Sequence, residues 1–219
     1  MIPSALISTR REYWSLFSVY VPIAAGVFVL VVVLIAWAAL RYRRRPPEAA
    51  ARWHENNPVE ATYAVLLLLV AAFLLVLTFG HEHLVDTVAN REKPSLIVDV
   101  TAARWEWEFS YPQYGIVQHS GTVGHQPLVV PVDEAIRFNL TSLDVIHAFW
   151  IPELEFKHDA FAGSVQHQVL TFTRTGTFPG QCAEFCGLRH AEMVFTARAV
   201  SPAAFAAWVR DRRRSGSST

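Results

Sequence analysis

Two long apolar runs constrain the fold of this chain more than any other feature of its sequence. They cover residues 19–40 and 61–80, and neither contains a charged side chain. Each is about 20 residues long, enough for a helix to cross the roughly 30 Å hydrocarbon core of a membrane. The sequence therefore predicts two transmembrane helices, in residues 19–40 and 59–80. A cleaved signal peptide is not favoured, because residues 41–45 are arginine-rich where a small-residue cleavage site would stand.

The connection between the two runs indicates the orientation of the chain. Residues 41–58 contain five arginines, whereas residues 1–18 and the segment just after residue 80 contain fewer basic side chains. Basic residues concentrate in the cytoplasmic loops of membrane proteins. We therefore expect an integral protein of the bacterial plasma membrane, or an equivalent membrane, in contact with lipid. Residues 1–18 and everything after residue 80, including both termini, would lie on the periplasmic or outer side.

The second predicted helix begins with a recognisable start signal. Asn57 suits the N-cap, Pro58 suits the first helical position, and Glu60 follows the cap by three residues. Glu60 is therefore expected to complete a capping box.

After a polar linker, residues 81–95, the sequence changes character. In residues 96–200, short apolar and β-branched runs alternate with turn residues about every ten positions, which is typical of an antiparallel β-sandwich or barrel. The expected strands are residues 96–101, 104–110, 115–119, 128–132, 135–141, 145–151, 168–173 and 193–200. The fold class predicted for this part is all-β.

The C-terminal segment, residues 201–219, is expected to form a short helix and a tail. The Ser-Pro pair at its start favours a helix cap. Phe205, Trp208 and Val209 would then lie on one apolar face.

Charge is unevenly distributed, although the whole chain is formally neutral. Between His81 and Val200 there are 14 acidic and 8 basic side chains. An acidic domain attracts a basic partner, whereas a surface of mixed charge can also serve solubility alone. No nucleic-acid partner is expected.

One short loop holds most of the soft metal-binding chemistry of the chain. Cys182, Cys186, His190 and Met193 fall within twelve residues, and the chain contains no other cysteine. A disulfide is the default for a cysteine pair on the outer side, but it leaves the histidine and the methionine without a function. Zinc accepts thiolate and imidazole but seldom a thioether. Thiolate, imidazole and methionine sulfur together favour copper.

The second cysteine points to two copper ions. A mononuclear blue-copper site uses one cysteine, two histidines and a weak axial methionine. Two bridging thiolates could instead hold two copper ions, which requires a second histidine, and His147 in an apolar run is the best candidate. A histidine in such a run is otherwise typical of a hydrogen-bonded core residue. Two copper ions sharing one unpaired electron and two thiolates would carry a net charge small enough to bury.

These residues resemble the binuclear CuA motif of cytochrome c oxidase subunit II. In that family a histidine precedes the pattern Cys-x-x-x-Cys-x-x-x-His-x-x-Met, which is matched here by His147, Cys182, Cys186, His190 and Met193. The resemblance extends over nearly the whole chain. It implies a two-helix transmembrane hairpin followed by a cupredoxin-like Greek-key sandwich with a short C-terminal helix.

The resemblance implies functions for three further residues. Glu184 would give a main-chain carbonyl to one copper, and its side chain would ligate a magnesium ion shared with the catalytic subunit. Trp105 matches the tryptophan through which electrons arrive from cytochrome c, although strand alternation alone also predicts a packed face here. Glu60 matches a glutamate at the mouth of a proton channel, in addition to its expected capping function.

The implied function is that of the electron-accepting subunit of a respiratory oxidase. Electrons from cytochrome c would pass through CuA to a haem in catalytic subunit I, which reduces oxygen to water with proton pumping, and a subunit III is also implied. The chain itself has no haem-binding or oxygen-binding constellation. The alternatives are the CuA subunit of a nitric oxide reductase and a membrane-tethered copper carrier or disulfide-stapled binding module.

Overall fold

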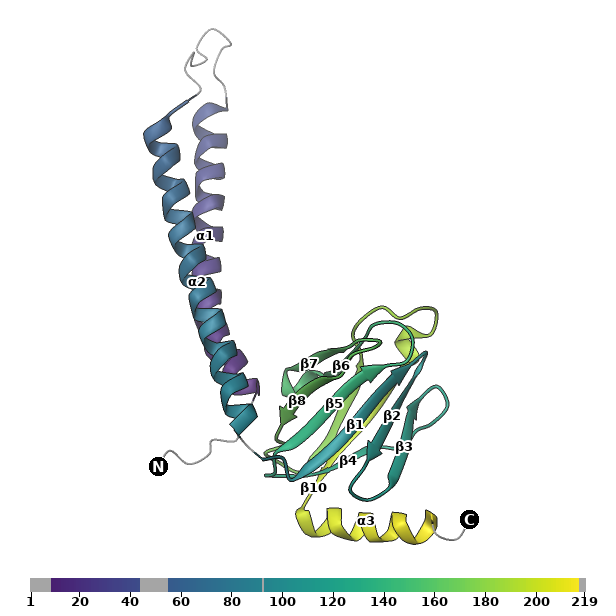
Figure 1. The fold of residues 1–219 in the computed structure, drawn as a ribbon. Coiled ribbons are helices and arrows are strands. Elements are labelled where there is room, and N and C mark those ends of the chain that lie inside the picture. The colour runs from purple at the N-terminus through teal and green to yellow at the C-terminus, as the bar shows by residue number, and fades with distance from the viewer. Residues whose placement is uncertain (1–8, 44–54, 92, 217–219) are drawn as a thin grey trace. The chain divides into compact units, whose positions relative to one another are not determined.

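The computed structural model describes residues 9–43, 55–91 and 93–216, and it divides into two compact units. One unit, residues 14–84, is a helical hairpin, and the other, which includes the chain from residue 85 onward, contains a β-sandwich. Figure 1 shows the hairpin helices α1 and α2 and the strands of the sandwich. The arginines at positions 44, 45 and 52, on which the expected orientation partly depends, lie outside the described residues.

The hairpin unit consists of two long helices that are apolar on every side. Helix α1 extends over Thr9–Tyr42 and α2 over Asn57–Arg91, so both continue beyond the apolar runs. Their candidate spans, Tyr13–Tyr42 and Asn57–Glu82, have mean hydropathies of 2.9 and 2.7, and the apolar core of neither span is buried within the structure. A helix that exposes apolar side chains all round needs a nonpolar surrounding, which a bilayer provides.

The start of α2 differs from the expected capping box by one residue. Asn56, not Asn57, is the cap, because its side-chain oxygen accepts a hydrogen bond from the Val59 amide at 3.4 Å and its carbonyl accepts one from the Glu60 amide at 2.9 Å. The Glu60 carboxylate in turn accepts a hydrogen bond from the Asn56 amide at 3.1 Å. Pro58 still lies in the first turn of the helix after this shift. Its missing amide hydrogen has no cost there, because the amide hydrogens of the first turn have no partner within the helix.

Among its described residues, the second unit contains ten strands in two five-stranded sheets. One sheet has the order β3-β2-β1-β5-β8 and the other the order β4-β10-β9-β6-β7. The strands are β1 (Leu96–Ala103), β2 (Glu106–Tyr111), β3 (Ile116–Gly121), β4 (Leu128–Pro131), β5 (Ile136–Ser142), β6 (His147–Ile151), β7 (Phe156–Ala160), β8 (Gln166–Leu170), β9 (Gly176–Cys182) and β10 (Val194–Val200). Two short 3-10 helices, η2 (Pro152–Leu154) and η3 (His190–Glu192), interrupt the connections.

Strand pairing confirms the predicted β-sandwich and adds one feature to it. Six of the eight strand pairs are antiparallel, whereas β1 pairs with β5 and β4 with β10 in parallel. A parallel pair arises where the chain leaves one sheet and returns in the same direction, which a strand pattern alone does not reveal.

Two strands of the sandwich were not predicted from the sequence. Strand β9 contains Pro179 and two glycines, which are typical of a turn, but at Pro179 the strand pairs on one side only, with β10. Strand β7 is mostly polar, and only Phe156 and Ala160 within it are buried. Both were missed because neither shows the apolar alternation of a central strand.

Aromatic rings fill the space between the sheets on the side of β6 and β10. Phe149 of β6 stacks on Phe195 of β10 with ring centroids 4.4 Å apart. Gly180 of β9 leaves room for this pair, because a Cβ atom there would lie 2.1 Å from the Phe195 ring. Alternation along β10 places Phe195 inside, and Phe149 lies in β6, a strand that is buried along most of its length.

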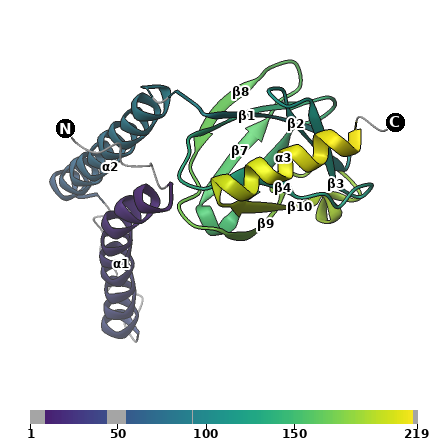
Figure 2. The same cartoon turned by 90° about the horizontal axis from the view of Figure 1, so that it is seen from below.

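Helix α3 (Pro202–Gly216) closes the chain as predicted. The Ser201 hydroxyl accepts a hydrogen bond from the Ala204 amide at 3.3 Å, and Phe205 and Val209 are buried. Trp208 packs against the core through the Tyr111 ring, with centroids 5.2 Å apart. Figure 2 shows α3 lying across the end of the sandwich at which β10 finishes. The loop that precedes β10 therefore lies at the other end.

Candidate metal centre

The loop between β9 and β10 brings its own soft side chains together by folding back on itself. The Cys182 amide, at the end of β9, donates to the Met193 carbonyl at 3.0 Å, so the two ends of the loop meet. Within the loop the His190 amide donates to the Gly187 carbonyl at 3.1 Å, and Gly187 has a positive φ of 117°. A side chain would be strained in that conformation, so the turn after Cys186 favours glycine.

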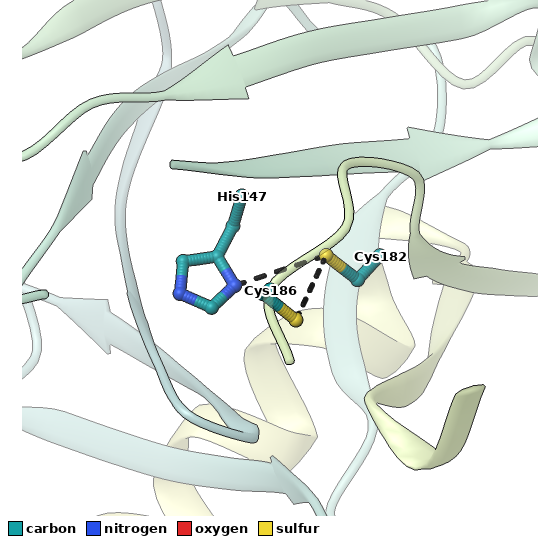
Figure 3. Close-up of side chains that lie close together, drawn as sticks. All are labelled: His147, Cys182 and Cys186. Atoms are coloured by element: carbon teal, nitrogen blue, oxygen red, sulfur yellow. Dashed lines mark hydrogen bonds between the residues drawn. The ribbon is translucent and has the colours of Figure 1, made fainter. Parts of the chain in front are cut away.

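His147 joins the two cysteines from a distant part of the chain. It is the first residue of β6, and antiparallel pairing of β6 with β9 sets Phe149 opposite Cys182. His147 Nδ1 lies 3.8 Å from the Cys182 sulfur, and the two sulfur atoms are 3.9 Å apart. Figure 3 shows the imidazole pointing toward the two thiols. The ligand atoms of these three residues all lie within 4.8 Å of one another, and all three are buried.

His190, Met193 and Glu184 complete the set of donor atoms. His190 Nδ1 lies 3.4 Å from the Cys186 sulfur, and the Met193 sulfur lies 3.8 Å from the same atom. The Glu184 main-chain carbonyl lies 3.2 Å from the Cys182 sulfur, while the residue itself is exposed. Thus each histidine is next to one cysteine, and the two cysteines lie between the histidines.

This arrangement fits a metal better than it fits a disulfide. The sulfur atoms are 3.9 Å apart, whereas a disulfide requires about 2.0 Å, and both cysteines are free thiols. Donors that bind one ion at about 2.0–2.3 Å lie roughly 3–4.5 Å from each other, and the adjacent donor atoms here are 3.2–3.9 Å apart. Thiolates, imidazoles and a thioether form a soft donor set, which is suited to copper. The residues would therefore hold copper without rearrangement of the fold.

The electrostatics of the two thiols differ. Burial raises the pKa of a thiol, but the hydrogen bond with His147 holds the pKa of Cys182 below its ordinary value. Burial and the neighbouring Cys182 raise the pKa of Cys186 to about 12. Without a cation the site therefore favours one thiolate and opposes a second. A cation between the sulfur atoms would reverse that preference, because each thiolate would then face positive charge.

Asp144 is a candidate site residue that the sequence analysis missed. Its carboxylate accepts a hydrogen bond from His147 Nε2 at 2.9 Å, which leaves Nδ1 facing the thiols. It also accepts the amide and the side chain of Arg104, at 2.9 and 3.1 Å. Although partial burial acts in the opposite direction, these bonds hold the pKa of Asp144 well below its usual range. Metal-binding histidines commonly have such a carboxylate partner, so an acidic residue three positions before His147 was the available signal.

Trp105 lies beside the loop that holds the cysteines. It precedes β2 and is half-buried, and a Cβ atom at Gly187 would lie 3.5 Å from its ring. Within the described part of the chain, its buried indole nitrogen has no hydrogen-bond partner. Trp105 therefore lies next to the residue that follows Cys186. Glu60 belongs to the hairpin unit and is not among these contacts.

Comparison with known proteins points to one family. Residues 120–200 match the family model described as cytochrome C oxidase subunit II, periplasmic domain. A protein of Streptomyces avermitilis named "Probable cytochrome c oxidase subunit 2" is 30% identical, over 86% of this chain and 71% of its own length. Cytochrome c oxidase subunit 2 of Cereibacter sphaeroides is 27% identical, over 96% of this chain and 79% of its own length.

Solved structures agree with the sequence relatives. The periplasmic domain of subunit II of cytochrome oxidase of Bradyrhizobium japonicum matches with a TM-score of 0.54 and 33% identity. The match covers 57% of this chain and 97% of that domain. The same subunit type in a mixed disulfide with a thioredoxin-like protein matches with a TM-score of 0.51 and 33% identity, over 57% of this chain and 94% of that one.

Proposed function

The chain belongs to the cytochrome c oxidase subunit II family, and we propose that it is the subunit through which electrons reach the catalytic centre of a respiratory oxidase. Two copper ions would be held by His147, Cys182, Cys186, His190 and Met193 and by the carbonyl of Glu184. Bound there, they would accept one electron at a time and release it. Oxygen reduction would take place in the partner subunit.

The convergence of two cysteines and two histidines on one enclosed space carries this proposal. Both cysteines have 4% of their surface exposed, and His147 and Met193 have none. A copper carrier needs accessible donors that release the ion, whereas an electron relay needs donors that stay in place during the redox cycle. The burial of these four donors therefore supports a relay and speaks against a carrier.

The surface around the loop supports contact with partner proteins. Phe185 and Leu188 flank Cys186 and Gly187 and are 79% and 92% exposed. Exposed apolar side chains at a functional site are typical of protein interfaces. We propose that this end of the sandwich contacts catalytic subunit I, in a complex that includes subunit III. Cytochrome c would approach at Trp105, attracted by the acidic charge of the domain.

A variant of Trp105 tests the route of the electrons. Trp105→Ala should slow reduction of the copper by cytochrome c and leave the copper spectrum unchanged. An unchanged rate of reduction would remove Trp105 from the route.

Two carboxylates are assigned further functions in this proposal. Glu184 is exposed and so is free to ligate a magnesium ion at the boundary with the catalytic subunit. Loss of bound magnesium from the assembled complex in Glu184→Ala would support this assignment, and unchanged magnesium would refute it.

Glu60 would stand at the mouth of a proton channel as well as capping α2. Glu60→Gln keeps an acceptor for the cap, so slower proton uptake with an intact α2 would separate the two functions.

Two apolar helices and the family membership indicate a membrane-anchored subunit. We propose that it spans a bacterial plasma membrane twice. The sandwich and both termini would lie on the periplasmic side, where a soluble cytochrome c can reach them. Protease treatment of intact and of permeabilised spheroplasts tests this orientation, because only a periplasmic sandwich is cleaved in both.

Copper content and the paramagnetic spectrum of the full chain, purified from membranes, test the central proposal. We expect two copper ions per chain and a hyperfine pattern in which both copper nuclei share one unpaired electron. A single copper ion, or two ions that do not share the electron, would contradict the proposal and favour a mononuclear site or a carrier.

A further inference from the structure

A second tryptophan, two residues after Trp105, reaches the loop from inside the sandwich. Trp107 of β2 is completely buried, and its indole nitrogen donates a hydrogen bond to the main-chain carbonyl of Met193 at 3.3 Å. An indole can only donate, so a buried tryptophan requires an acceptor such as this carbonyl. Trp105 precedes β2 and is only half-buried, so the two tryptophans do not meet the loop in the same way.

The hydrogen bond from Trp107 is one of three that fix the main chain of Met193. The Met193 amide donates to the His190 carbonyl at 3.2 Å, and its carbonyl accepts the Cys182 amide at 3.0 Å in addition to the indole. Met193 lies between η3 and β10, one residue before the registered pairing of β10 with β9 begins. The indole hydrogen bond therefore connects the opposite sheet to the main chain at the point where the chain leaves the loop.

The ring of Trp107 is itself held rigidly. It packs edge-on against Phe149 and Phe195, with centroids 5.5 and 5.6 Å away. It also faces the His147 ring at 6.2 Å. Trp107 thus contacts two donor residues that come from different parts of the chain, one through a hydrogen bond and one through ring packing. A side chain that is fixed in this way also fixes the position of the groups that it contacts.

We propose that Trp107 is a positioning residue, which holds Met193 by its main-chain carbonyl and so sets how closely the thioether approaches copper. The inference rests on the proposed copper site. A weak axial methionine tunes the reduction potential of a copper–thiolate site. A thioether that is held less firmly donates less to the oxidised ion, so loss of the indole hydrogen bond should raise the potential.

The decisive variant is Trp107→Phe in the full chain with its copper bound. Phenylalanine keeps an aromatic ring in the core and removes the N–H donor. In a redox titration, the ratio of reduced to oxidised copper at a fixed potential should rise by up to about fivefold. This is the change in an equilibrium constant that corresponds to the net free energy of one hydrogen bond. The absorption and paramagnetic spectra should shift with it. In the metal-free chain, amide hydrogen exchange of residues 182–193 should become faster.

Trp105→Phe is the matched control for the potential and the spectra. It makes the same substitution two residues earlier, at an indole nitrogen that has no hydrogen-bond partner in the described structure. The potential and spectra of this variant should remain those of the unmodified chain. Equal shifts in both variants would overturn the proposal.

Two further variants separate the hydrogen bond from packing. Trp107→His has a smaller ring that retains an N–H donor, so its potential should lie closer to that of the unmodified chain than the potential of Trp107→Phe does. In a Met193→Leu background, Trp107→Phe should have no further effect on the potential, because the group through which it acts is gone. A potential set by ring volume alone, or full additivity with Met193→Leu, would refute the inference.

The outcomes distinguish this inference from the proposed function. If the unmodified chain fails to bind two copper ions, the proposed function fails first. If it binds them and Trp107→Phe loads copper with an unchanged potential and spectrum, only the positioning function of Trp107 fails.

Discussion

The hairpin and the sandwich place their apolar side chains in opposite ways. In the hairpin, side chains such as Leu67 and Phe73 are more than half exposed, and a tyrosine hydroxyl of α1 contacts a main-chain carbonyl of α2. In the sandwich, Phe149 and Trp107 are fully buried. The hairpin therefore depends on its surroundings for stability, whereas the sandwich depends on its own core.

This difference explains why the candidate metal site lies in the sandwich and not in the hairpin. A site that must hold several donor atoms at fixed distances needs rigid neighbours on all sides. The sandwich provides these through two sheets, a dense aromatic cluster and hydrogen bonds to the main chain of the loop. The hairpin offers no comparable support among its described residues, and its apolar surface suits attachment to the membrane.

Removal of one thiol should have the largest effect and should affect only one of the two units. Cys186→Ser should lower copper affinity by more than about 100-fold, beyond the 10- to 100-fold loss typical when a partner outside the metal's own ligands is removed. Membrane insertion should be unchanged. Copper content and resistance to carbonate extraction measure the two effects. Leu188→Ala, at an exposed position in the same loop, should keep its copper. Loss of membrane insertion in Cys186→Ser would contradict the independence of the two units.

The second largest effect should come from a change in core packing, and it should again differ between the two units. Phe149→Ala should lower the free energy of unfolding of the sandwich by about 3–5 kcal/mol, because it removes a ring from a closely packed cluster. Denaturant unfolding followed by tryptophan fluorescence measures this. Leu67→Ala in α2 should change the same quantity by less than about 0.5 kcal/mol. Similar losses in both variants would show that the hairpin contributes to the stability of the sandwich.

A buried hydroxyl of the sandwich should have a moderate and pH-dependent effect. The Tyr111 hydroxyl donates to the Val129 carbonyl and accepts the Val129 amide, both at 2.9 Å. Tyr111→Phe should lower the free energy of unfolding by about 1–3 kcal/mol, because it leaves both main-chain groups unpaired.

The pH dependence of this effect follows from the pKa of the same hydroxyl. Burial raises the pKa of Tyr111 above its ordinary value of about 10. The stabilisation is therefore complete below pH 10 and is lost as the pH rises beyond it. Between pH 8 and 11, the free energies of unfolding of the unmodified chain and of Tyr111→Phe should therefore converge as the pH rises. A difference that grows with pH would contradict this.

The corresponding change in the hairpin should have the smallest effect. The Tyr20 hydroxyl of α1 donates to the Leu74 carbonyl of α2 at 3.1 Å and contacts the Thr78 hydroxyl. Tyr20→Phe should weaken packing of the helices by about 0.6 kcal/mol, the average for polar contacts between membrane helices. Detergent titration of the reconstituted chain measures it. A loss as large as that of Tyr111→Phe would show that the hairpin, like the sandwich, depends on internal polar contacts.

Features that depend on neighbouring residues were predicted well from the sequence. The apolar runs, the all-β character of residues 96–200, the cap at Ser201 and the apolar face of α3 all follow from local composition and spacing. The spacing of Cys182, Cys186, His190 and Met193 likewise indicated a soft metal site. The cap of α2 was wrong by one residue, because adjacent asparagines satisfy the same local rule.

The sequence by itself determined that this chain has two spans, a β domain and one loop rich in soft donors, because span length and donor spacing are properties of adjacent residues. Only the tertiary structure decided which distant groups meet there. The Trp107 indole on Met193 and the parallel strand pairs depend on sheet packing. These contacts join segments from different strands, and their energies arise only when both sheets are in place.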